Sequence, residues 1–437
     1  MTALNRMSAR ELARKLARRD LTASAVVAAC FERIAARETQ VRAWTHLDRD
    51  AALARARALD RAALTGPLHG LPIGVKDLFD TVDMPTAYGS PIYTGHRPPW
   101  DASSVALARA AGAIVVGKTV TTEFATFHPR PTRNPHHLAH TPGGSSSGSA
   151  AAVADCMVPL AFGSQTAGSI VRPSAFCGVI GYKPTYGTIN RVGARMISDT
   201  LDTVGAIART VPDVALLVSV LAERPELAID DDVGAAPRVG LCRTHQWSEL
   251  TEDAMTCFDT TARALEHAGA TVRDVTLPNS FAGLVAAQIS IMTHEVAACL
   301  SYEWLQHRDR LSADMVKMIE QGRGVSKTHY DAARELAHAC RAELGDVFRD
   351  VDVLVAPSTH GEAPEGMATG DPLFQRMWTL LHVPCVHVPA GRGSHGLPLG
   401  VTVIGALASD RMLLSAAHWI HRAVGGSEVT ALPARMQ

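Results

Sequence analysis

Residues 163–183 read Gly163-Ser-Gln-Thr-Ala-Gly-Ser169-Ile-Val-Arg172-Pro-Ser-Ala-Phe-Cys-Gly-Val-Ile-Gly-Tyr-Lys183. Glycines and side chains that form hydrogen bonds crowd the beginning of this stretch, and apolar residues dominate its second half. Glycine lets a backbone turn sharply and present consecutive N–H groups to an anion, as an oxyanion hole requires. We therefore interpret the stretch as an enzyme site built into a folded core.

A second stretch of the same texture lies upstream, where residues 141–149 read Thr-Pro-Gly-Gly-Ser-Ser-Ser-Gly-Ser. A flexible linker rich in glycine and serine is the simplest alternative, and it would require polar surroundings. The residues from Ala150 to Phe162 are mostly apolar instead. The sequence thus favours a second buried loop of the same site.

A third element is Lys76, which follows the apolar run Leu71-Pro-Ile-Gly-Val75. An amine at the end of a buried strand loses solvation, which lowers its pKa and allows it to act as a neutral base. In isolation a lysine at a strand end is usually just solvated, so the three stretches have to be considered together.

Together they resemble the amidase signature family of serine amidohydrolases, through Gly70-Leu-Pro-Ile-Gly-Val-Lys76-Asp, Thr141-Pro-Gly-Gly-Ser145 and Gln165-Thr-Ala-Gly-Ser169. The step of 24 residues from Ser145 to Ser169 matches the family's step between its two serines. Weaker resemblance extends over nearly the whole chain.

The resemblance implies a mechanism. Ser169 is expected to be the nucleophile, Ser145 the proton relay, held after a cis peptide bond from Gly144, and Lys76 the final base. Backbone N–H groups of Thr166, Ala167, Gly168 and Ser169 are expected to form the oxyanion hole. Neither a cofactor nor a metal is implied.

The sequence departs from the usual family pattern beside the nucleophile. Gln165 stands where the family has aspartate, Val171 stands where it has arginine, and an arginine follows one residue later as Arg172. One hypothesis is that Arg172, with Gly144 nearby, binds a substrate carboxylate, as in the malonamidase-like branch. The alternative is that Arg172 pairs with another internal acid.

Three rival interpretations of these stretches fit less well. Gly144-Ser-Ser-Ser-Gly148 matches G-x-S-x-G, with Ser146 as an esterase nucleophile, but no strand pattern precedes it. A phosphate-binding loop at 163–169 would need a lysine that is missing. The four histidines between residues 128 and 140 lack the acid of a zinc motif, so we expect structural roles for them.

The pattern of elements predicts an α/β class, because short apolar strands alternate with helical stretches. The family resemblance implies one large domain with a central mixed sheet covered by helices. We expect an N-terminal helical segment over 1–66 packed on the core, and a main domain over 67–437 with its signature core at about 70–210. Expected strands include 71–75, 113–116, 239–242, 271–275, 351–355, 385–388 and 399–404, and expected helices include 252–268, 280–305 and 329–348.

Composition limits the partners. The 437 residues carry a formal net charge of −1, which gives no electrostatic reason to expect nucleic acid or a membrane surface. The longest apolar stretch is too short to span a bilayer, and no secretory signal is evident, so we expect a cytoplasmic protein. The sequence leaves open whether the protein forms a homodimer. The eight scattered cysteines are expected to be reduced.

The expected activity is hydrolysis of a small amide through an acyl-enzyme, releasing a carboxylic acid and ammonia or an amine. An amidotransferase A-type subunit that supplies ammonia from glutamine within a complex is the alternative, and an amidase acting on ureas or carbamates is another. A catalytically silent binding protein is disfavoured by the complete set of Lys76, Ser145 and Ser169. The motifs do not specify the substrate.

Overall fold

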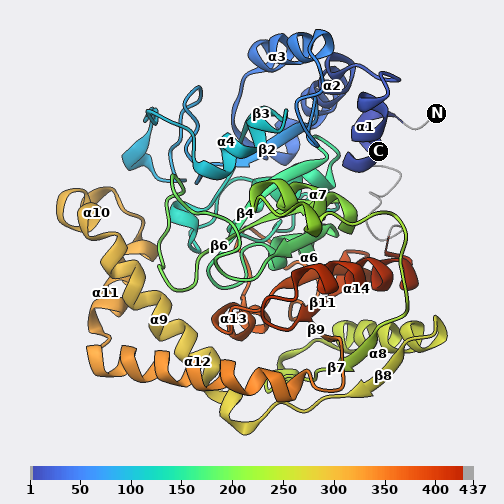
Figure 1. Ribbon diagram of the computed structural model, residues 1–437. Helices are drawn as coiled ribbons and strands as arrows, with labels where there is room; N and C mark the ends of the chain where they lie inside the picture. Colours follow the sequence, from blue (N-terminus) through green and yellow to red (C-terminus); the bar gives the residue numbers. More distant parts are fainter. Residues whose placement is uncertain (1–2, 427–437) are drawn as a thin grey trace.

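The computed structural model describes residues 3–426 and builds them around one mixed β-sheet (Figure 1). The order of its 11 strands across the described residues is β1 (Trp44–Leu47), β3 (Ile114–Thr119), β2 (Pro72–Lys76), β4 (Leu160–Gln165), β6 (Thr203–Ala208), β5 (Ile180–Lys183), β10 (Cys385–Arg392), β11 (Pro398–Gly405), β9 (Val353–Pro357), β7 (Arg238–Leu241) and β8 (Thr271–Asp274). The expected single domain with a central mixed sheet is confirmed.

The centre of the sheet positions the site. Strand β2 is parallel to both β3 and β4, so the carboxyl ends of all three strands lie at the same edge. Lys76 is the last residue of β2, and Gln165 is the last residue of β4. The chain therefore brings two of the three predicted stretches to one edge of the sheet.

Helices cover the sheet on both faces (Figure 1). They are α1 (Ala9–Ala17), α2 (Ala23–Val41), α3 (Arg49–Arg61), α4 (Ser103–Ala110), α5 (Ser147–Ala154), α6 (Val171–Cys177), α7 (Val211–Leu221), α8 (Glu252–His267), α9 (Leu284–Cys299), α10 (Ser301–Gln306), α11 (Ala313–Gly324), α12 (Lys327–Val347), α13 (Leu373–Leu380) and α14 (Asp410–Ala423). Many begin at a hydroxyl cap; Ser8, Thr22, Thr251 and Ser326 each accept a backbone N–H of the first turn.

The central strands are buried at every position, which explains why they are apolar without alternation. All residues of β2, β3, β4 and β6 are buried. A strand that is covered on both faces needs apolar side chains on both faces. The polar exceptions, among them Lys76 and Gln165, therefore stand out as functional candidates.

The structure differs from the sequence-based expectation in several elements. Residues 1–66, expected to be helical, also supply the edge strand β1, which pairs with β3. The helix expected over 280–305 is interrupted at Leu300, which divides α9 from α10. The segment Asp230–Pro237 is a surface connection between strands of the same sheet, as the single-domain interpretation requires.

One helical region is long and apolar enough to cross a membrane by length and composition, namely Asn279–Cys299. In this fold it includes α9, which packs against α11, α12 and α13. Its polar residues Gln288 and Glu295 are buried and form hydrogen bonds inside the protein. The apolar character of α9 thus serves the packing of these helices.

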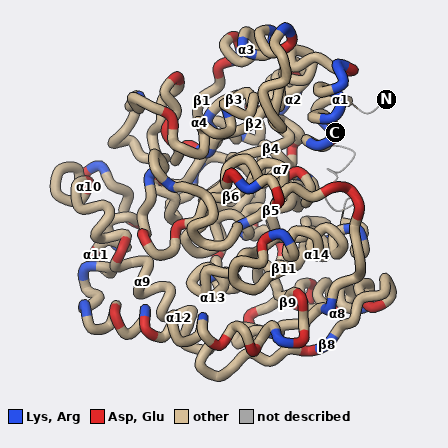
Figure 2. The backbone as a smooth tube through the Cα atoms, viewed as in Figure 1, with Lys and Arg blue, Asp and Glu red and all other residues tan. Residues whose placement is uncertain are grey.

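Charges of both signs are interspersed along the chain. Figure 2 shows acidic and basic residues interspersed on α8 and α12. This distribution agrees with the near-zero net charge of the sequence. All eight cysteines are free thiols in the structure, as expected.

Candidate active site

Two buried loops meet at the carboxyl edge of β2 and β4. The first contains Ser145, which follows a cis peptide bond from Gly144 as the family resemblance implied, and leads into α5. The second runs from Gln165 to Ser169 and leads into α6. The backbone N–H of Ser146 donates to the Ser169 carbonyl at 3.3 Å, which joins the two loops.

Lys76 extends from the end of β2 into this junction. Its Nζ lies 2.8 Å from Ser145 Oγ and 2.7 Å from Ser164 Oγ. The lysine is completely buried, and burial lowers the pKa of its amine to about 7, although the Asp202 carboxylate opposes this shift. An amine with this pKa is partly neutral at pH 7 and can accept a proton from Ser145.

Ser169 occupies the start of the turn before α6 and is 6% exposed. Its hydroxyl makes no hydrogen bond to any described residue, and none joins it to Ser145 Oγ. Catalytic hydrogen bonds are often long before substrate binds. The structure therefore brings Lys76 and Ser145 into direct contact, and places Ser169 on the neighbouring loop.

Asp202 is a buried acid that the sequence did not single out. Its carboxylate accepts hydrogen bonds from the Thr166 hydroxyl, from Ile197 N at 2.7 Å and from Ser198 N at 3.0 Å. Burial raises the pKa of Asp202 to about 6, and these hydrogen bonds limit the rise. Asp202 thus fixes Thr166 and supplies negative charge near Lys76.

Each backbone carbonyl from Thr166 to Gly168 accepts a hydrogen bond from a residue outside this loop. Gln288 Nε2 donates to Thr166 O at 3.0 Å, and Thr379 Oγ1 donates to Ala167 O at 2.8 Å. The backbone N–H of Arg172 donates to Gly168 O at 2.8 Å. In a trans peptide the C=O of one residue and the N–H of the next residue point in opposite directions. A donor that fixes one of these carbonyls therefore also fixes the following N–H, on the side away from the donor.

The corresponding N–H groups are free. Among the described residues, no acceptor binds the backbone N–H of Thr166, Ala167, Gly168 or Ser169. A buried N–H normally has a partner, so a run of free ones beside a serine hydroxyl is unusual. Such an arrangement has the free donors that binding the oxygen of a tetrahedral intermediate requires.

Gln165 explains how the chain tolerates the departure from the usual pattern. Its Oε1 accepts the N–H groups of Ile170 and Val171, at 2.9 Å and 3.1 Å, at the start of α6. Its Nε2 donates to Thr379 Oγ1 at 3.0 Å, and that hydroxyl in turn donates to Ala167 O. A neutral amide both accepts and donates, so Gln165 needs no arginine at position 171.

Arg172 is buried, and it binds backbone carbonyls instead of an internal acid. Its Nε and Nη2 donate to Gly144 O at 3.1 Å and 2.7 Å, and its Nη1 donates to Gly370 O at 2.6 Å. The alternative expectation of an internal acidic partner is therefore wrong for the residues the structure describes. Gly144 is held by this contact, and an added Cβ on it would lie 2.8 Å from Thr369 Cγ2.

The rival interpretations are not supported by the geometry. Ser146 precedes α5, and the described residues leading to it form no strand. His136 contacts Cys177 O at 3.0 Å, His140 contacts Ala363 O at 2.7 Å, and His128 contacts Asp314 at 2.9 Å. His128, His136 and His140 therefore contact separate parts of the protein, and the His137 ring packs edge-on against the His140 ring.

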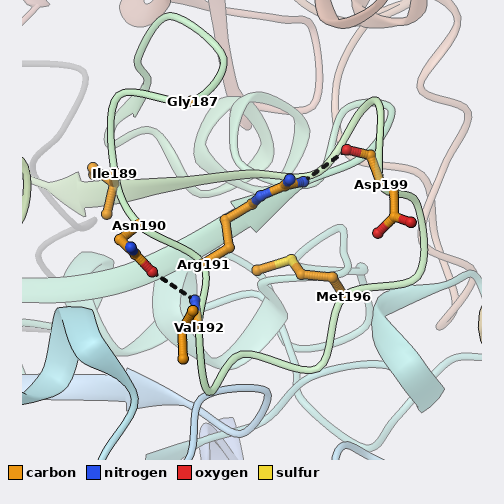
Figure 3. A pocket seen from close by; sticks show the side chains of 7 residues that line it. All are labelled: Gly187, Ile189, Asn190, Arg191, Val192, Met196 and Asp199. Carbon is orange, nitrogen blue, oxygen red and sulfur yellow. Dashed lines mark hydrogen bonds between the residues drawn. The ribbon is translucent and has the colours of Figure 1, made fainter.

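A surface pocket is lined in part by Arg191, whose Nη1 donates to Asp199 O at 3.0 Å (Figure 3). The same Nη1 donates to Asp202 O at 3.2 Å, which connects the lining of the pocket to the site. None of the residues expected from the sequence lines this pocket. Its lining consists of Gly187, Ile189, Asn190, Arg191, Val192, Met196 and Asp199.

Five residues in or next to the site are not identifiable from the sequence alone. Ser164 lies inside a stretch that was recognised, so its position next to Gln165 was the available signal. Asp202, Gln288, Thr379 and Arg376 stand in unrelated segments and reach the site only through the fold. No local pattern distinguishes them.

Comparisons with known proteins agree with this geometry. A family model described as Amidase matches residues 25–414. The A-type subunit of the glutamyl-tRNA(Gln) amidotransferase from Mycobacterium ulcerans (strain Agy99) is 34% identical over 476 aligned residues, covering 94% of this chain and 96% of that protein. A solved structure described as an amidase is 30% identical, with a TM-score of 0.88 and coverage of 96% of this chain and 100% of that one. The native peptide amidase from Stenotrophomonas maltophilia is 28% identical, with a TM-score of 0.82 and coverage of 96% and 97%.

Proposed function

Because the chain belongs to the amidase family, we propose that it breaks the C–N bond of a small amide by forming an acyl-enzyme on Ser169. The observation that carries this proposal is the contact of the buried Lys76 amine with Ser145 Oγ at 2.8 Å, beside the loop of Ser169. A serine hydroxyl is a weak nucleophile without a positioned base, and this contact supplies one.

In the first step Ser169 Oγ attacks the amide carbonyl. Its proton passes to Ser145 Oγ, while the proton of Ser145 passes to the neutral amine of Lys76. Ser164, also bound to that amine, holds Lys76 in place without taking part in the transfer. The proton then returns through Ser145 to the nitrogen of the leaving group.

The negative oxygen of the tetrahedral intermediate is proposed to bind the free N–H groups between Thr166 and Ser169. Each such donor contributes about 3 to 4 kcal/mol to the transition state in comparable sites. Water then attacks the acyl-enzyme and releases a carboxylic acid. Every step uses side chains and backbone groups of this chain alone.

Two functions share this first half-reaction. The names of the curated relatives favour an amidotransferase A-type subunit, in which glutamine is the amide and ammonia passes to a partner protein. The solved amidase and peptide amidase support a hydrolase that acts alone. Curated relatives that are 33% to 34% identical carry the amidotransferase name, so glutamine belongs among the first substrates to be tested.

For the stand-alone hydrolase, amides that carry a carboxylate are the proposed substrate class. Arg172 lies three residues after the nucleophile and carries a positive charge. Its Nε, Nη1 and Nη2 already donate hydrogen bonds to the carbonyls of Gly144 and Gly370. Ureas and carbamates are alternative substrates, because attack by Ser169 on their carbonyl follows the same path.

Ammonia release separates the two functions. The purified chain is incubated with glutamine, neutral amides, dicarboxylic monoamides, ureas and carbamates, with the Ser169→Ala variant as control. Release from simple amides by the lone chain supports the hydrolase. Release from glutamine only when partner proteins are added supports the amidotransferase. Activity that survives in Ser169→Ala contradicts the proposed nucleophile.

A further inference from the structure

Two buried arginines lie against one phenyl ring next to the site. The guanidinium carbons of Arg172 in α6 and Arg376 in α13 are 5.7 Å and 5.9 Å from the centre of the Phe127 ring. Arg172 is 1% exposed and Arg376 is 8% exposed. Both side chains therefore bring positive charge into the interior beside the loops of Ser145 and Ser169.

Neither cation has an anionic partner within the described part of the chain. No carboxylate of residues 3–426 forms an ion pair with either arginine. Asp371 is the acid whose charge acts on both, but its side chain is exposed and its Oδ1 accepts the N–H of Leu373 at 2.9 Å. Buried cations without a counter-ion are costly, so an anion from outside the chain would be bound strongly there.

Counting donors shows which arginine is available. A guanidinium has five N–H groups. Arg172 uses three of its own, on Gly144 O and Gly370 O. Among the residues that the structure describes, Arg376 makes one hydrogen bond, from Nη1 to Gln288 Oε1 at 2.6 Å. Most donors of Arg376 are therefore free, whereas Arg172 mainly holds two backbone segments together.

The position of Arg376 links it to the reacting centre. Gln288, which accepts from Arg376, donates through its other amide atom to Thr166 O at the start of the oxyanion loop. The same stretch that carries Arg376 also packs on the glycine of that loop, because a Cβ added to Gly168 would lie 2.9 Å from Pro372 Cβ. A ligand held by Arg376 would thus lie close to the attacking serine.

We infer that Arg376 is the residue that binds the carboxylate of the substrate, and that Arg172 supports it by charge while positioning Gly144. This inference rests on the proposed function and narrows its substrate to amides with a carboxylate near the scissile bond. Monoamides of short dicarboxylic acids have this chemistry, and so does glutamine. The inference therefore applies to both candidate functions.

The test compares matched substrates on two variants. Values of kcat/KM are measured for malonamate, succinamate and glutamine, and for the neutral amides propionamide and butyramide. Arg376→Gln should lower kcat/KM for the best carboxylated amide about 10- to 100-fold, because a charge-assisted hydrogen bond pair is lost. For the neutral amides it should change kcat/KM less than about threefold, which is a smaller effect than the loss of a hydrogen bond to a charged group. Arg376→Lys should retain part of the preference, and Arg55→Gln on the exposed face of α3 should change nothing.

Equal losses on carboxylated and neutral amides would show a structural role and overturn the inference, as would unchanged kinetics on both. Ligand binding is measured separately in the inactive Ser169→Ala background, where malonate or succinate should raise the melting temperature above a sodium chloride control of equal ionic strength. That rise should vanish when Arg376→Gln is added. If the wild-type chain cleaves neutral amides but shows neither effect, the inference fails and the proposed function stands. If it cleaves no amide, either alone or with partner proteins added, the proposed function fails, whatever the binding result.

Discussion

Lys76 is a lysine at the buried end of strand β2. It ends a strand that is buried on both faces, and two serine hydroxyls are its hydrogen-bond partners within the described residues. Burial lowers the pKa of its amine to about 7, although the nearby Asp202 carboxylate opposes this shift. The chemistry of the site is therefore expected to follow the charge of this one group.

The pH dependence tests this expectation. Lys76 must be neutral to accept a proton, so kcat/KM should rise as pH increases through about 7 and then level. Lys76→Arg, which stays protonated, should lose at least about 10³-fold at every pH. An activity profile flat between pH 5 and 9 would contradict the assignment. Between the folded pKa of about 7 and the ordinary value of 10.5, only the unfolded chain binds this proton, so the contribution of Lys76 to stability rises with pH in that window.

A second prediction for a single residue concerns Thr379. Its hydroxyl donates to Ala167 O, and it thereby orients the N–H of Gly168 in the oxyanion loop. Thr379→Val keeps the shape and removes the donor, so we expect kcat to fall about tenfold or more with KM nearly unchanged, since the oxyanion exists only in the transition state. Thr293→Val in α9, whose hydroxyl bonds only to its own helix, is the matched control. A rise in KM alone, with kcat intact, would argue against this role.

The sequence predicts those candidate residues that sit inside a recognisable motif. Ser145 and Ser169 stand out because glycine and serine are unusually dense around them, and Lys76 stands out because it follows the apolar run 71–75 in a stretch that resembles the amidase signature family. Gln288 and Thr379 were not found, because each looks like an ordinary helix residue and acts on a carbonyl more than a hundred positions away. Hydrogen bonds between distant segments leave no local pattern.

At the scale of elements, the short helix α5 fixes the loop that carries Ser145. Gly148 in its first turn donates to Val120 O at 3.0 Å, so the helix lies directly against the segment after β3. A Cβ on Gly148 would collide with the backbone of Ala43 and Val120. The element can approach this closely only because a glycine stands there.

Two alanine substitutions should therefore have opposite effects. Gly148→Ala should destabilise the protein by about 1 to 3 kcal/mol through overpacking against rigid backbone. Gly345→Ala in α12, where an added Cβ meets nothing within 4 Å, should stabilise it by about 0.5 to 1 kcal/mol. Denaturant unfolding of both variants measures the difference. A neutral Gly148→Ala would mean that α5 can shift away from β3.

The sequence predicts strands where apolar runs are bounded by glycine or proline, as in β2, β10 and β11. Strand β1 was missed because Trp44-Thr-His-Leu47 is short and alternates too little. The break between α9 and α10 was missed because no proline or glycine marks Leu300. Packing of the surrounding helices decides such boundaries.

For the whole molecule, the order of strands divides the sheet by chain position. Strands β1 to β6 form one side and β7 to β11 the other, and they meet where β5 pairs with β10. Lys183 Nζ donates across this junction to Val383 O at 2.6 Å, and Tyr182 donates to Asp410 at 2.6 Å. The proposed catalytic residues lie on the first side, and Gln288, Thr379 and Arg376 come from the second part of the chain.

The connection at Asp230–Pro237 should thus be dispensable once the protein has folded. A protease site inserted after Gly234, which is exposed, should allow cleavage into two fragments that co-elute and retain most of the activity. Gel filtration with denaturing electrophoresis and an activity assay would check this. Fragments that separate in native buffer would show that the β5–β10 junction is too weak to hold the sides together.

The bonds of Gln288 have a consequence for laboratory evolution. One end of its amide accepts from Arg376 and the other donates to the Thr166 carbonyl, so a substitution of Gln288 itself that admits a different acyl group also loosens the oxyanion loop. Selection for a new substrate at position 288 alone should stall at variants that bind well and turn over slowly. Libraries that randomise position 376 and keep Gln288 should avoid this loss, because the donor to the Thr166 carbonyl stays in place.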